Sequence, residues 1–387
     1  MRKKIGIITT FKANNYGAEL QAYALQKKLR DLGYDAELID YLFYKNRKYK
    51  YTAGSEPWMN FTLMQRIKQF ALYRIALPLI DVVGNWMSSK MRERTHNFES
   101  FHEGHSRLSQ TYYSQKELYE AKMDYDVFVV GSDQVWNPNT AISISPYFLD
   151  FAPEKSKKIS YASSFGVDRI PFSCSEQYKG GLNGLDHISC REFQGVELVK
   201  NLTGKEATHV LDPTLLLDIT DWETISVHTY CPKKAKYILL YNIMEVDSVY
   251  QFAQRISSET GWPIIRLCKR AFFVASHKGV RDVRSAGPAD FLGLIENSTI
   301  FITNSFHGCA FAINLKMLFW CILDKKASNN GRINSLLEKF KLQDRVIDLS
   351  DVENIDYLRS IDYTEAQKIL EEEREKSLSY LISSIEN

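Results

Sequence analysis

The chain has 387 residues, of which 44% are hydrophobic and 25% are charged, and its formal net charge is +2. This is the composition of a globular protein long enough for two domains, and the charge is too small to indicate a nucleic-acid partner. The six cysteines have no CxxC spacing, which favours buried thiols in a reducing compartment over a zinc site or disulfide framework. No apolar segment reaches the roughly 20 residues that span a bilayer, so we expect a cytoplasmic protein without a bound metal or cofactor.

Short apolar runs alternate with helical patterns along the chain. Residues 4–10 predict a buried strand, 17–32 a helix that stops at Gly33, and 36–41 a second strand, which together form a βαβ unit. Two more strands are predicted at 126–133 and 157–166. A second series predicts strands at 186–189, 207–211, 236–242, 263–268, 298–303 and 317–322, and helices at 191–202, 246–259, 288–296, 306–315 and 332–340.

This alternation predicts an α/β fold of two Rossmann-like domains that face a cleft. We place the N-terminal domain at residues 1–170 and the C-terminal domain at residues 171–350. Residues 351–387 form a helical segment that we expect to pack back on the N-terminal domain.

A basic helical insertion is expected at residues 41–105. Its part 41–96 has ten Lys or Arg residues and three acidic residues, a difference of seven positive charges. One interpretation is a solvated helical excursion, which also leaves His102 and His105 in water. The other is a surface that meets anionic lipid, with the protein peripheral at the inner membrane face.

Ligands of open α/β sheets bind beyond the carboxyl ends of the strands, so the residues after each strand are candidates for a site. Asn14, Asn15 and Tyr16 follow the first strand and lead into a helix N-terminus, which favours an anion or a hydroxyl-rich ligand. Ordinary turn chemistry is the alternative. There is no GxGxxG pattern here, so no dinucleotide is indicated.

A polar cluster with an aromatic residue follows the strand at 126–130. Asp133, Gln134 and Trp136 combine directional hydrogen-bonding groups with a flat ring, a mixture that suits a sugar. Asp133 is a candidate base for a sugar hydroxyl, whereas a structural turn is the alternative.

Two arginines are candidate anion ligands. Arg191 opens a predicted helix, where a cation is unfavourable unless an anion lies nearby. A surface ion pair with Glu192 is the alternative. Arg332 follows the strand at 317–322, whereas Asp212 is expected to be a structural cap.

The segment "FITNSFHGCAFAI" interrupts two apolar runs with polar residues. Asn304 and Ser305 end a strand, Ser305 is a candidate N-cap, and His307 falls in the first turn of the next helix. A helix N-terminus with an imidazole can bind phosphate or place a proton donor beside it.

Six segments in order resemble the polysaccharide pyruvyl transferase family: "NNYGAELQAYAL", "GSDQVWNP", "SYASSFG", "SCREFQG", "VLDPTLLL" and "GPADFLGLIENSTIFITNSFHGCAFAI". The resemblance runs from about residue 5 to about residue 340. It implies a two-domain fold similar to GT-B glycosyltransferases. It also implies transfer of pyruvate from phosphoenolpyruvate onto two hydroxyls of a sugar in a cell-surface polysaccharide or bacterial exopolysaccharide, giving a cyclic ketal and phosphate.

By this resemblance, the N-terminal domain is expected to be the acceptor side and the C-terminal domain the phosphoenolpyruvate side. Arg191 matches a donor-binding arginine and His307 a donor-site histidine. Some members of the family have an arginine where this chain has Ser305, and we hypothesise that Arg332 replaces it. The acceptor is a sugar or, if 41–96 meets a membrane, a lipid-linked oligosaccharide. A glycosyltransferase that uses a nucleotide sugar and a non-catalytic carbohydrate-binding relative are the alternatives.

Overall fold

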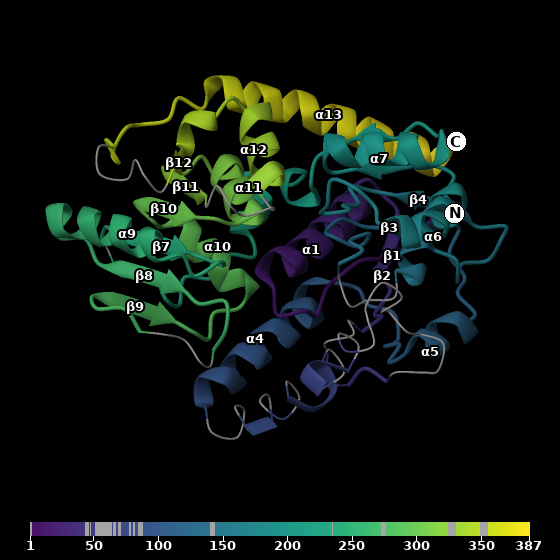
Figure 1. The fold of residues 1–387 in the computed structure, drawn as a ribbon, viewed down its shortest axis with the longest axis horizontal. Coiled ribbons are helices and arrows are strands. Elements are labelled where there is room, and N and C mark those ends of the chain that lie inside the picture. The colour runs from purple at the N-terminus through teal and green to yellow at the C-terminus, as the bar shows by residue number, and fades with distance from the viewer. Residues whose placement is uncertain are drawn as a thin grey trace. The chain divides into compact units, whose positions relative to one another are not determined.

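The computed structural model describes residues 2–42, 46, 48–50, 64, 67–68, 71–76, 79, 82–83, 88–139, 144–233, 235–271, 276–323, 330–348 and 355–387. The chain divides into two compact units, whose elements are labelled in Figure 1. Unit 1 comprises Met1–Gly84, His102–Leu216 and Glu373–Asn387, and unit 2 comprises Asn85–Phe101 and Leu217–Glu372.

Unit 1 is built on a parallel sheet in the order β2-β1-β3-β4. These strands are β1 (Lys4–Ile8), β2 (Asp35–Leu38), β3 (Val127–Val130) and β4 (Lys157–Ser160). All four residues of β3 are buried, which is typical of a parallel strand covered on both faces. The strand order reverses between β1 and β3, and the carboxyl edge at such a reversal is where ligands of this architecture bind.

Two short parallel strands, β5 (Ser189–Cys190) and β6 (Thr208–His209), extend unit 1 beyond β4. Isolated bridges between Ile159 and His187 and between Ser163 and Cys190 connect β5 to the β4 region. Unit 1 therefore continues to Leu216, whereas the sequence pattern placed the boundary near residue 170. As a consequence, Arg191 belongs to the same unit as Asp133.

The first helix of unit 1, α1 (Tyr16–Asp31), is largely buried. Asn15 caps α1 by accepting a hydrogen bond from the backbone N–H of Gly17 at 3.1 Å. Every residue from Tyr16 to Gln26 is buried. The other helices are α5 (Gln115–Glu120), α6 (Ser175–Asn183) and α7 (Phe193–Thr203), with single turns at η1 (Ala71–Ala76), η2 (Ser145–Phe148), η3 (Phe172–Cys174) and η4 (Pro213–Leu215).

Unit 2 contains a six-stranded parallel sheet in the order β12-β11-β10-β7-β8-β9, and Figure 1 shows the strands side by side in this order. They are β7 (Ile238–Tyr241), β8 (Ile264–Leu267), β9 (Val280–Val283), β10 (Ile300–Thr303), β11 (Phe319–Leu323) and β12 (Val346–Asp348). This is the strand order of a Rossmann fold, with the reversal between β7 and β10. The predicted Rossmann-like class is confirmed.

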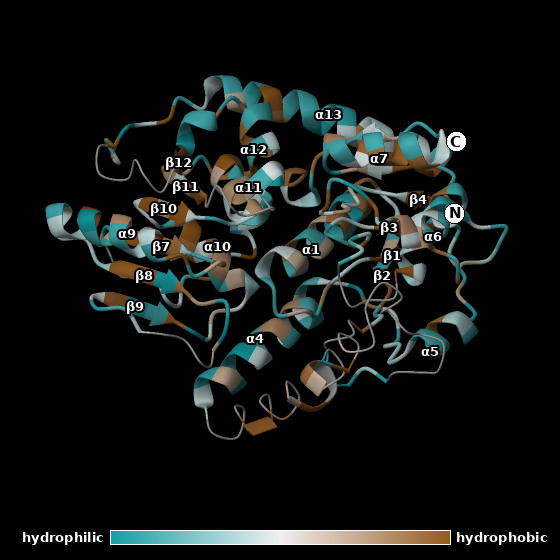
Figure 2. Cartoon of the chain, in the orientation of Figure 1, coloured by the Kyte–Doolittle hydropathy of each residue, from teal (hydrophilic) through white to brown (hydrophobic). Residues whose placement is uncertain are grey.

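The helices of unit 2 lie between its strands in the chain, except for the first, which precedes β7. They are α8 (Ile219–Glu223), α9 (Asp247–Thr260), α10 (Pro288–Glu296), α11 (Phe306–Asn314) and α12 (Asn330–Lys339), with a turn at η5 (Gln343–Arg345). Figure 2 shows hydrophobic residues along β7, β8 and β10, where the sheet is covered by helices. Their buried apolar side chains form the core of unit 2.

Two long helices contribute residues to both units. In α4 (Ser89–His105), Asn97 donates to the carbonyl of Ser285 in unit 2, whereas His102 belongs to unit 1. In α13 (Thr364–Glu386), the residues from Glu373 onward belong to unit 1. There, the hydroxyl of Ser377 accepts the backbone N–H of Leu211 at 2.9 Å. Most of the predicted insertion before α4 lies outside the described residues.

Candidate functional site

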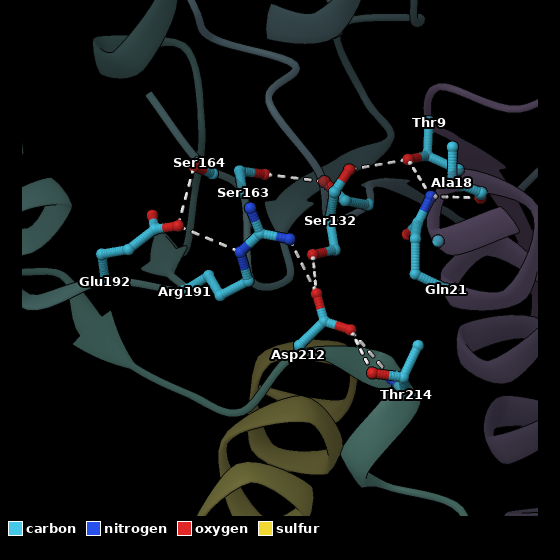
Figure 3. Close-up of polar contacts among 12 residues, drawn as sticks. Thr9, Ala18, Gln21, Ser132, Ser163, Ser164, Arg191, Glu192, Asp212 and Thr214 are labelled. Atoms are coloured by element: carbon cyan, nitrogen blue, oxygen red, sulfur yellow. Dashed lines mark hydrogen bonds and ion pairs between the residues drawn. The ribbon is translucent and has the colours of Figure 1, made fainter. Parts of the chain in front are cut away.

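Polar side chains that follow four strands of unit 1 meet at the carboxyl edge of its sheet (Figure 3). Ser132 follows β3, Ser163 and Ser164 follow β4, Arg191 follows β5, and Asp212 follows β6. Parallel strands bring these residues together because all their carboxyl ends lie at the same edge.

Arg191 is held by two carboxylates at this edge. Its Nε donates to Oε1 of Glu192 at 3.0 Å, and its Nη1 donates to Oδ2 of Asp212 at 2.8 Å. The side chains of Arg191 and Asp212 are 1% and 0% exposed. Ser164 also donates to Glu192, and Ser132 donates to Asp212, both at 2.9 Å. The predicted ion pair of Arg191 with Glu192 is present, but it is buried and does not lie at the surface as the sequence analysis expected.

Carboxylates outnumber the cation at this cluster. Burial lowers the pKa of Arg191, but the negative charges of Glu192, Asp212 and Asp133 outweigh burial and hold that pKa above its ordinary value. The guanidinium is therefore cationic at any physiological pH. One guanidinium faces three carboxylates, so the edge favours a neutral ligand with hydroxyls over an additional anion.

Buried hydrogen bonds connect this cluster to β1 and α1. The carbonyl of Ser132 accepts from the hydroxyl of Thr9 at 2.8 Å. Gln21 in α1 donates from Nε2 to that same hydroxyl oxygen and to the carbonyl of Ala18, each at 3.0 Å. Because Thr9, Gln21 and Ser132 are buried, these bonds fix the loop that carries Asp133.

Asp133 is the partly exposed carboxylate of the cluster. Its φ is 71°, a left-handed conformation that aspartate adopts more readily than most residues. Its carbonyl accepts the N–H groups of Val135 at 2.8 Å and Ser164 at 3.0 Å. Its charge acts on both Arg191 and Tyr147. Strained backbone of this kind is found at functional sites, and the position suits a base.

The loop between β1 and α1 carries three predicted ligand residues. Asn14 and Asn15 are exposed, with a left-handed φ of 53° at Asn14 and the N-cap of α1 at Asn15. Tyr16 is 1% exposed and packs in the core, so the prediction that it contacts substrate is wrong for this structure. Both asparagines stay candidates.

A buried contact between Glu19 and His102 supports this loop. The carboxylate of Glu19 accepts the backbone N–H groups of Lys12 at 2.8 Å and Ala13 at 2.9 Å. His102 Nε2 lies 2.9 Å from the same carboxylate, and both side chains are 0% exposed. The expectation that His102 is solvated is wrong, because its ring also packs edge-on against Phe11.

Trp136 does not offer its ring to a ligand, which corrects the sequence prediction. The side chain is 0% exposed, its Nε1 donates to the carbonyl of Tyr147 at 2.8 Å, and its ring stacks on Phe148. The ring of Trp136 is buried in the core, so it has no exposed face on which a sugar could stack. Gln134 is partly exposed, and its Oε1 accepts a hydrogen bond from Asn137.

An aromatic residue that the sequence analysis missed is exposed beside the cluster. Phe193, the first residue of α7, is 58% exposed and stacks on His209 with ring centroids 4.0 Å apart. His209 Nε2 lies 3.0 Å from the carbonyl of Arg191, which fixes the imidazole. In the sequence, the position of Phe193 directly after Arg191 and Glu192 was the feature that could have indicated it as a candidate site residue.

In unit 2, two asparagines meet where the strand order reverses between β7 and β10. Asn304 Nδ2 donates to Oδ1 of Asn242 at 2.7 Å, and Asn304 Oδ1 accepts the N–H of Ile243 at 2.8 Å. Asn304 is 3% exposed. The structure therefore gives Asn304 a part in joining the two loops, and its predicted contact with a ligand stays a prediction.

The turn from β10 into α11 places His307 in the first turn of a buried helix. Ser305 is the N-cap, as predicted, and its Oγ accepts the N–H of Gly308 at 3.3 Å. His307 is 9% exposed, and its ring lies edge-on to Phe306. Positive backbone charge at the N-terminus of α11 surrounds this turn.

Arg332 lies in the first turn of α12 and is partly exposed. The helices α11 and α12 pack against each other and follow the adjacent strands β10 and β11. Arg332 and His307 therefore lie in first turns of neighbouring helices of the same unit. The structure places Asp133 and Arg191 in unit 1 and His307 and Arg332 in unit 2.

Among the described residues, no group of three or more His, Cys, Asp or Glu side chains has an arrangement that could hold a metal ion. The same residues include no helix that is long and apolar enough to cross a membrane.

Known proteins similar to this chain agree with these observations. A family model described as "Polysaccharide pyruvyl transferase" matches residues 15–322. A solved structure of Arabidopsis thaliana UGT89C1 with UDP-L-rhamnose is similar with a TM-score of 0.53 and 12% identity, covering 100% of both chains. The UDP-GlcNAc 2-epimerase from Methanocaldococcus jannaschii has a TM-score of 0.45 and 12% identity, covering 95% of this chain and 92% of that chain. No curated protein matches.

Two α/β units built on parallel sheets give this chain a GT-B-like fold, which the similarity to the UGT89C1 structure supports. The family model covers most of the chain. The chain belongs to the polysaccharide pyruvyl transferase family.

Proposed function

We propose that the protein transfers pyruvate from phosphoenolpyruvate onto two hydroxyls of one sugar residue. A proton adds to C3 of the enol, one sugar oxygen bonds to C2, and the second sugar oxygen replaces phosphate at C2. The two sugar hydroxyls release two protons in total. One is matched by the proton added at C3, which becomes a methyl group, and the other leaves with phosphate. The products are a cyclic ketal and inorganic phosphate. The observation that carries this proposal is the family match over residues 15–322.

The turn at the start of α11 supports a donor site in unit 2. Phosphoenolpyruvate carries a carboxylate and a phosphate, and a helix N-terminus favours anions. His307 lies in the first turn of α11, and Arg332 lies in the first turn of α12. We assign His307 to proton transfer at phosphoenolpyruvate. We assign Arg332 to binding an anionic group of phosphoenolpyruvate.

The acidic carboxyl edge of unit 1 supports an acceptor site. Asp133 is partly exposed and can take a proton from a sugar hydroxyl. Phe193, which directly follows Arg191 and Glu192 in the sequence, supplies a flat apolar surface, the role first predicted for Trp136. Asn14, Asn15 and Gln134 supply hydrogen-bonding groups to the same edge.

The contacts of Arg191 favour a role other than the donor contact that the family resemblance implies. Its Nε and Nη1 are engaged by Glu192 and Asp212, so a donor anion would compete with two buried carboxylates. We propose that Arg191 positions the carboxylates of Glu192 and Asp212 at this edge. Its predicted contact with the donor is tested by measuring phosphoenolpyruvate affinity in Arg191→Lys, which keeps the charge.

The test is phosphate release from phosphoenolpyruvate with cell-surface glycan as acceptor, and mass spectrometry of the glycan for a pyruvate ketal. His307→Ala and Asp133→Asn are each expected to lower kcat by about 10²–10⁴-fold, the usual contribution of a general acid or base. His96→Ala is the matched control because His96 is exposed on α4. Full turnover by His307→Ala would contradict the assignment of this residue. Turnover of a nucleotide sugar in place of phosphoenolpyruvate would identify a glycosyltransferase.

A further inference from the structure

Lys12 is a partly exposed cation at the carboxyl edge of unit 1. It follows β1, and its Nζ donates at 2.6 Å to Oδ2 of Asp40, which follows the adjacent strand β2. The side chain of Lys12 is 22% exposed, whereas that of Asp40 is 3% exposed. Oδ2 of Asp40 also accepts a hydrogen bond from the hydroxyl of Thr111 at 2.5 Å. The carboxylate is therefore fixed, and it orients the ammonium group.

The ammonium group of Lys12 can form further hydrogen bonds. A lysine carries three N–H donors. Within the described ranges of the chain, Asp40 is the one residue that accepts a hydrogen bond from Nζ. Because part of the side chain reaches solvent, the remaining donors can bind oxygen atoms of a ligand.

The backbone at Lys12 is held in an unusual conformation. Its φ is 54°, a left-handed value that residues other than glycine rarely adopt. The carboxylate of Glu19 stabilises this conformation, because it accepts the backbone N–H groups of Lys12 at 2.8 Å and Ala13 at 2.9 Å. Glu19 is held in turn by His102, and both side chains are fully buried. Backbone strain that a surrounding network maintains is a feature of functional sites.

The loop that carries Lys12 is joined to the loop that carries Asp133. Lys12 follows β1 and Asp133 follows β3, the two strands between which the order of the sheet reverses. The hydroxyl of Thr9 donates to the carbonyl of Ser132 at 2.8 Å, directly before Asp133 (Figure 3). Ligands of this architecture bind at such a reversal, so both loops border the same proposed acceptor side.

The charges at this edge indicate an uncharged ligand. Asp40 neutralises Lys12, and Arg191 faces three carboxylates. The edge therefore has more carboxylates than cations, which disfavours a carboxylate or phosphate group on the ligand. An ammonium group beside a carboxylate suits a hydroxyl, whose oxygen accepts a hydrogen bond from N–H.

We propose that Lys12 donates a hydrogen bond to a hydroxyl oxygen of an uncharged acceptor sugar and so determines which sugars bind at this edge. The inference rests on the proposed acceptor side of unit 1, and it adds the class of sugar and a residue that contacts it. Asp40 and Glu19 are positioning residues, because they act through Lys12.

Sugar binding is measured by saturation-transfer NMR without phosphoenolpyruvate. The probes are the methyl glycosides of glucose, galactose, mannose and N-acetylglucosamine, with methyl glucuronide and methyl galacturonide as acidic counterparts. Lys12→Met removes the ammonium group but leaves the buried Asp40 without its cation. A second variant therefore combines Lys12→Met with Asp40→Asn, which removes both charges. Circular dichroism verifies that the variants are folded.

Lys27→Met is the matched control. Lys27 is 32% exposed and forms an ion pair with Asp31 at 2.7 Å, as Lys12 does with Asp40, but it lies toward the C-terminal end of α1. Its loss should leave sugar binding as in the wild type, because the carboxyl edge of the sheet lies at the other end of this helix.

The wild type is expected to bind at least one uncharged glycoside, and to bind the uronides more weakly. Both Lys12 variants should bind that glycoside at least about tenfold more weakly, the usual effect of losing a hydrogen bond to a charged group. A folded double variant that binds as the wild type does would show that Lys12 only pairs with Asp40, and would overturn the proposal. Preference for the uronides, or failure of the wild type to bind any probe, would overturn it as well.

Phosphate release from phosphoenolpyruvate with the cell-surface glycan is measured in parallel. The Lys12 variants should raise the KM for the glycan about tenfold and leave the KM for phosphoenolpyruvate unchanged. Sugar binding that depends on Lys12, without phosphate release, would contradict the proposed reaction alone. Phosphate release, with sugar binding that does not depend on Lys12, would contradict this inference alone.

Discussion

Nη1 of Arg191 donates to Oδ2 of Asp212 at 2.8 Å, and neither side chain has appreciable contact with water. These residues are 21 positions apart in the sequence and follow the adjacent strands β5 and β6. Asp212 also accepts hydrogen bonds from Thr214 and Ser132. The pair therefore stabilises the carboxyl edge of unit 1.

Loss of Asp212 should destabilise unit 1. Asp212→Ala leaves the buried guanidinium with one fewer carboxylate, and breaking a buried ion pair costs about 3–5 kcal/mol. Asp218→Ala is the control, because Asp218 also caps a helix but is exposed, and a cap is worth about 1 kcal/mol. Urea unfolding followed by fluorescence measures both. Equal losses in the two variants would show that the Arg191–Asp212 pair contributes little beyond a cap.

Gly308 allows α11 to begin directly against β10. A Cβ at this position would lie 2.5 Å from Oγ1 of Thr303, which donates to the carbonyl of Tyr241 and accepts the N–H of Ser305. Thr303 cannot rotate without losing these bonds, so Gly308→Ala should cost about 1–3 kcal/mol.

The control for Gly308 is another helical glycine with open space around it. A Cβ at Gly180 in α6 would meet no atom within 4 Å. Gly180→Ala should therefore increase the free energy of unfolding by up to about 1 kcal/mol, since alanine has the higher helix propensity. Urea titrations that place both variants on the same side of the wild type would contradict this pair of predictions.

Phe193 should affect the acceptor and leave the donor unaffected. Its ring is 58% exposed, so Phe193→Ala removes a stacking surface with little change in the core. If the proposed acceptor side is correct, KM for the glycan rises about tenfold, because one aromatic stacking contact is worth about 0.5–1.5 kcal/mol beyond its buried area. The KM for phosphoenolpyruvate is measured in parallel, and a rise in that constant alone would assign Phe193 to the donor.

The anchor of α4 on unit 2 should respond to pH. Tyr230 donates to Oε1 of Glu93 at 2.7 Å, and this hydrogen bond lowers the pKa of Glu93 below its ordinary value of 4.5. Since the folded pKa is the lower one, the contribution of Glu93 to stability is present above pH 4.5 and is lost as the pH falls through the folded pKa.

Tyr230→Phe tests this dependence. At neutral pH the variant should be less stable by about 1 kcal/mol, the value of a typical hydrogen bond. The difference from the wild type should shrink as the pH falls below 4.5. Chemical unfolding at several pH values measures it, and a difference that stays constant down to the acid limit would exclude Glu93 as the cause.

Local patterns in the sequence predicted many of the elements. The apolar run at 298–303 and the N-cap at Ser305 correctly predicted β10 and the start of α11. The helix predicted at 288–296 has the same bounds as α10. These predictions succeed because a strand or a helix end depends mainly on residues that are close in the sequence.

Contacts between distant segments decided the parts that the sequence did not show. The pairing of β5 beyond β4 moved Arg191 into unit 1, and the ring of Trp136 became part of a core with Phe148. His102 is buried by Glu19, which lies 83 positions earlier in the sequence. A local sequence pattern cannot indicate contacts between residues that are so far apart in the sequence.

The sequence by itself determined the family, the parallel α/β architecture and the residue types available at the strand ends. The tertiary structure decided which of those residues are exposed, which pair with each other and which are buried. The physical reason is that alternation and capping are local properties, whereas burial and ion pairing depend on which strands become neighbours.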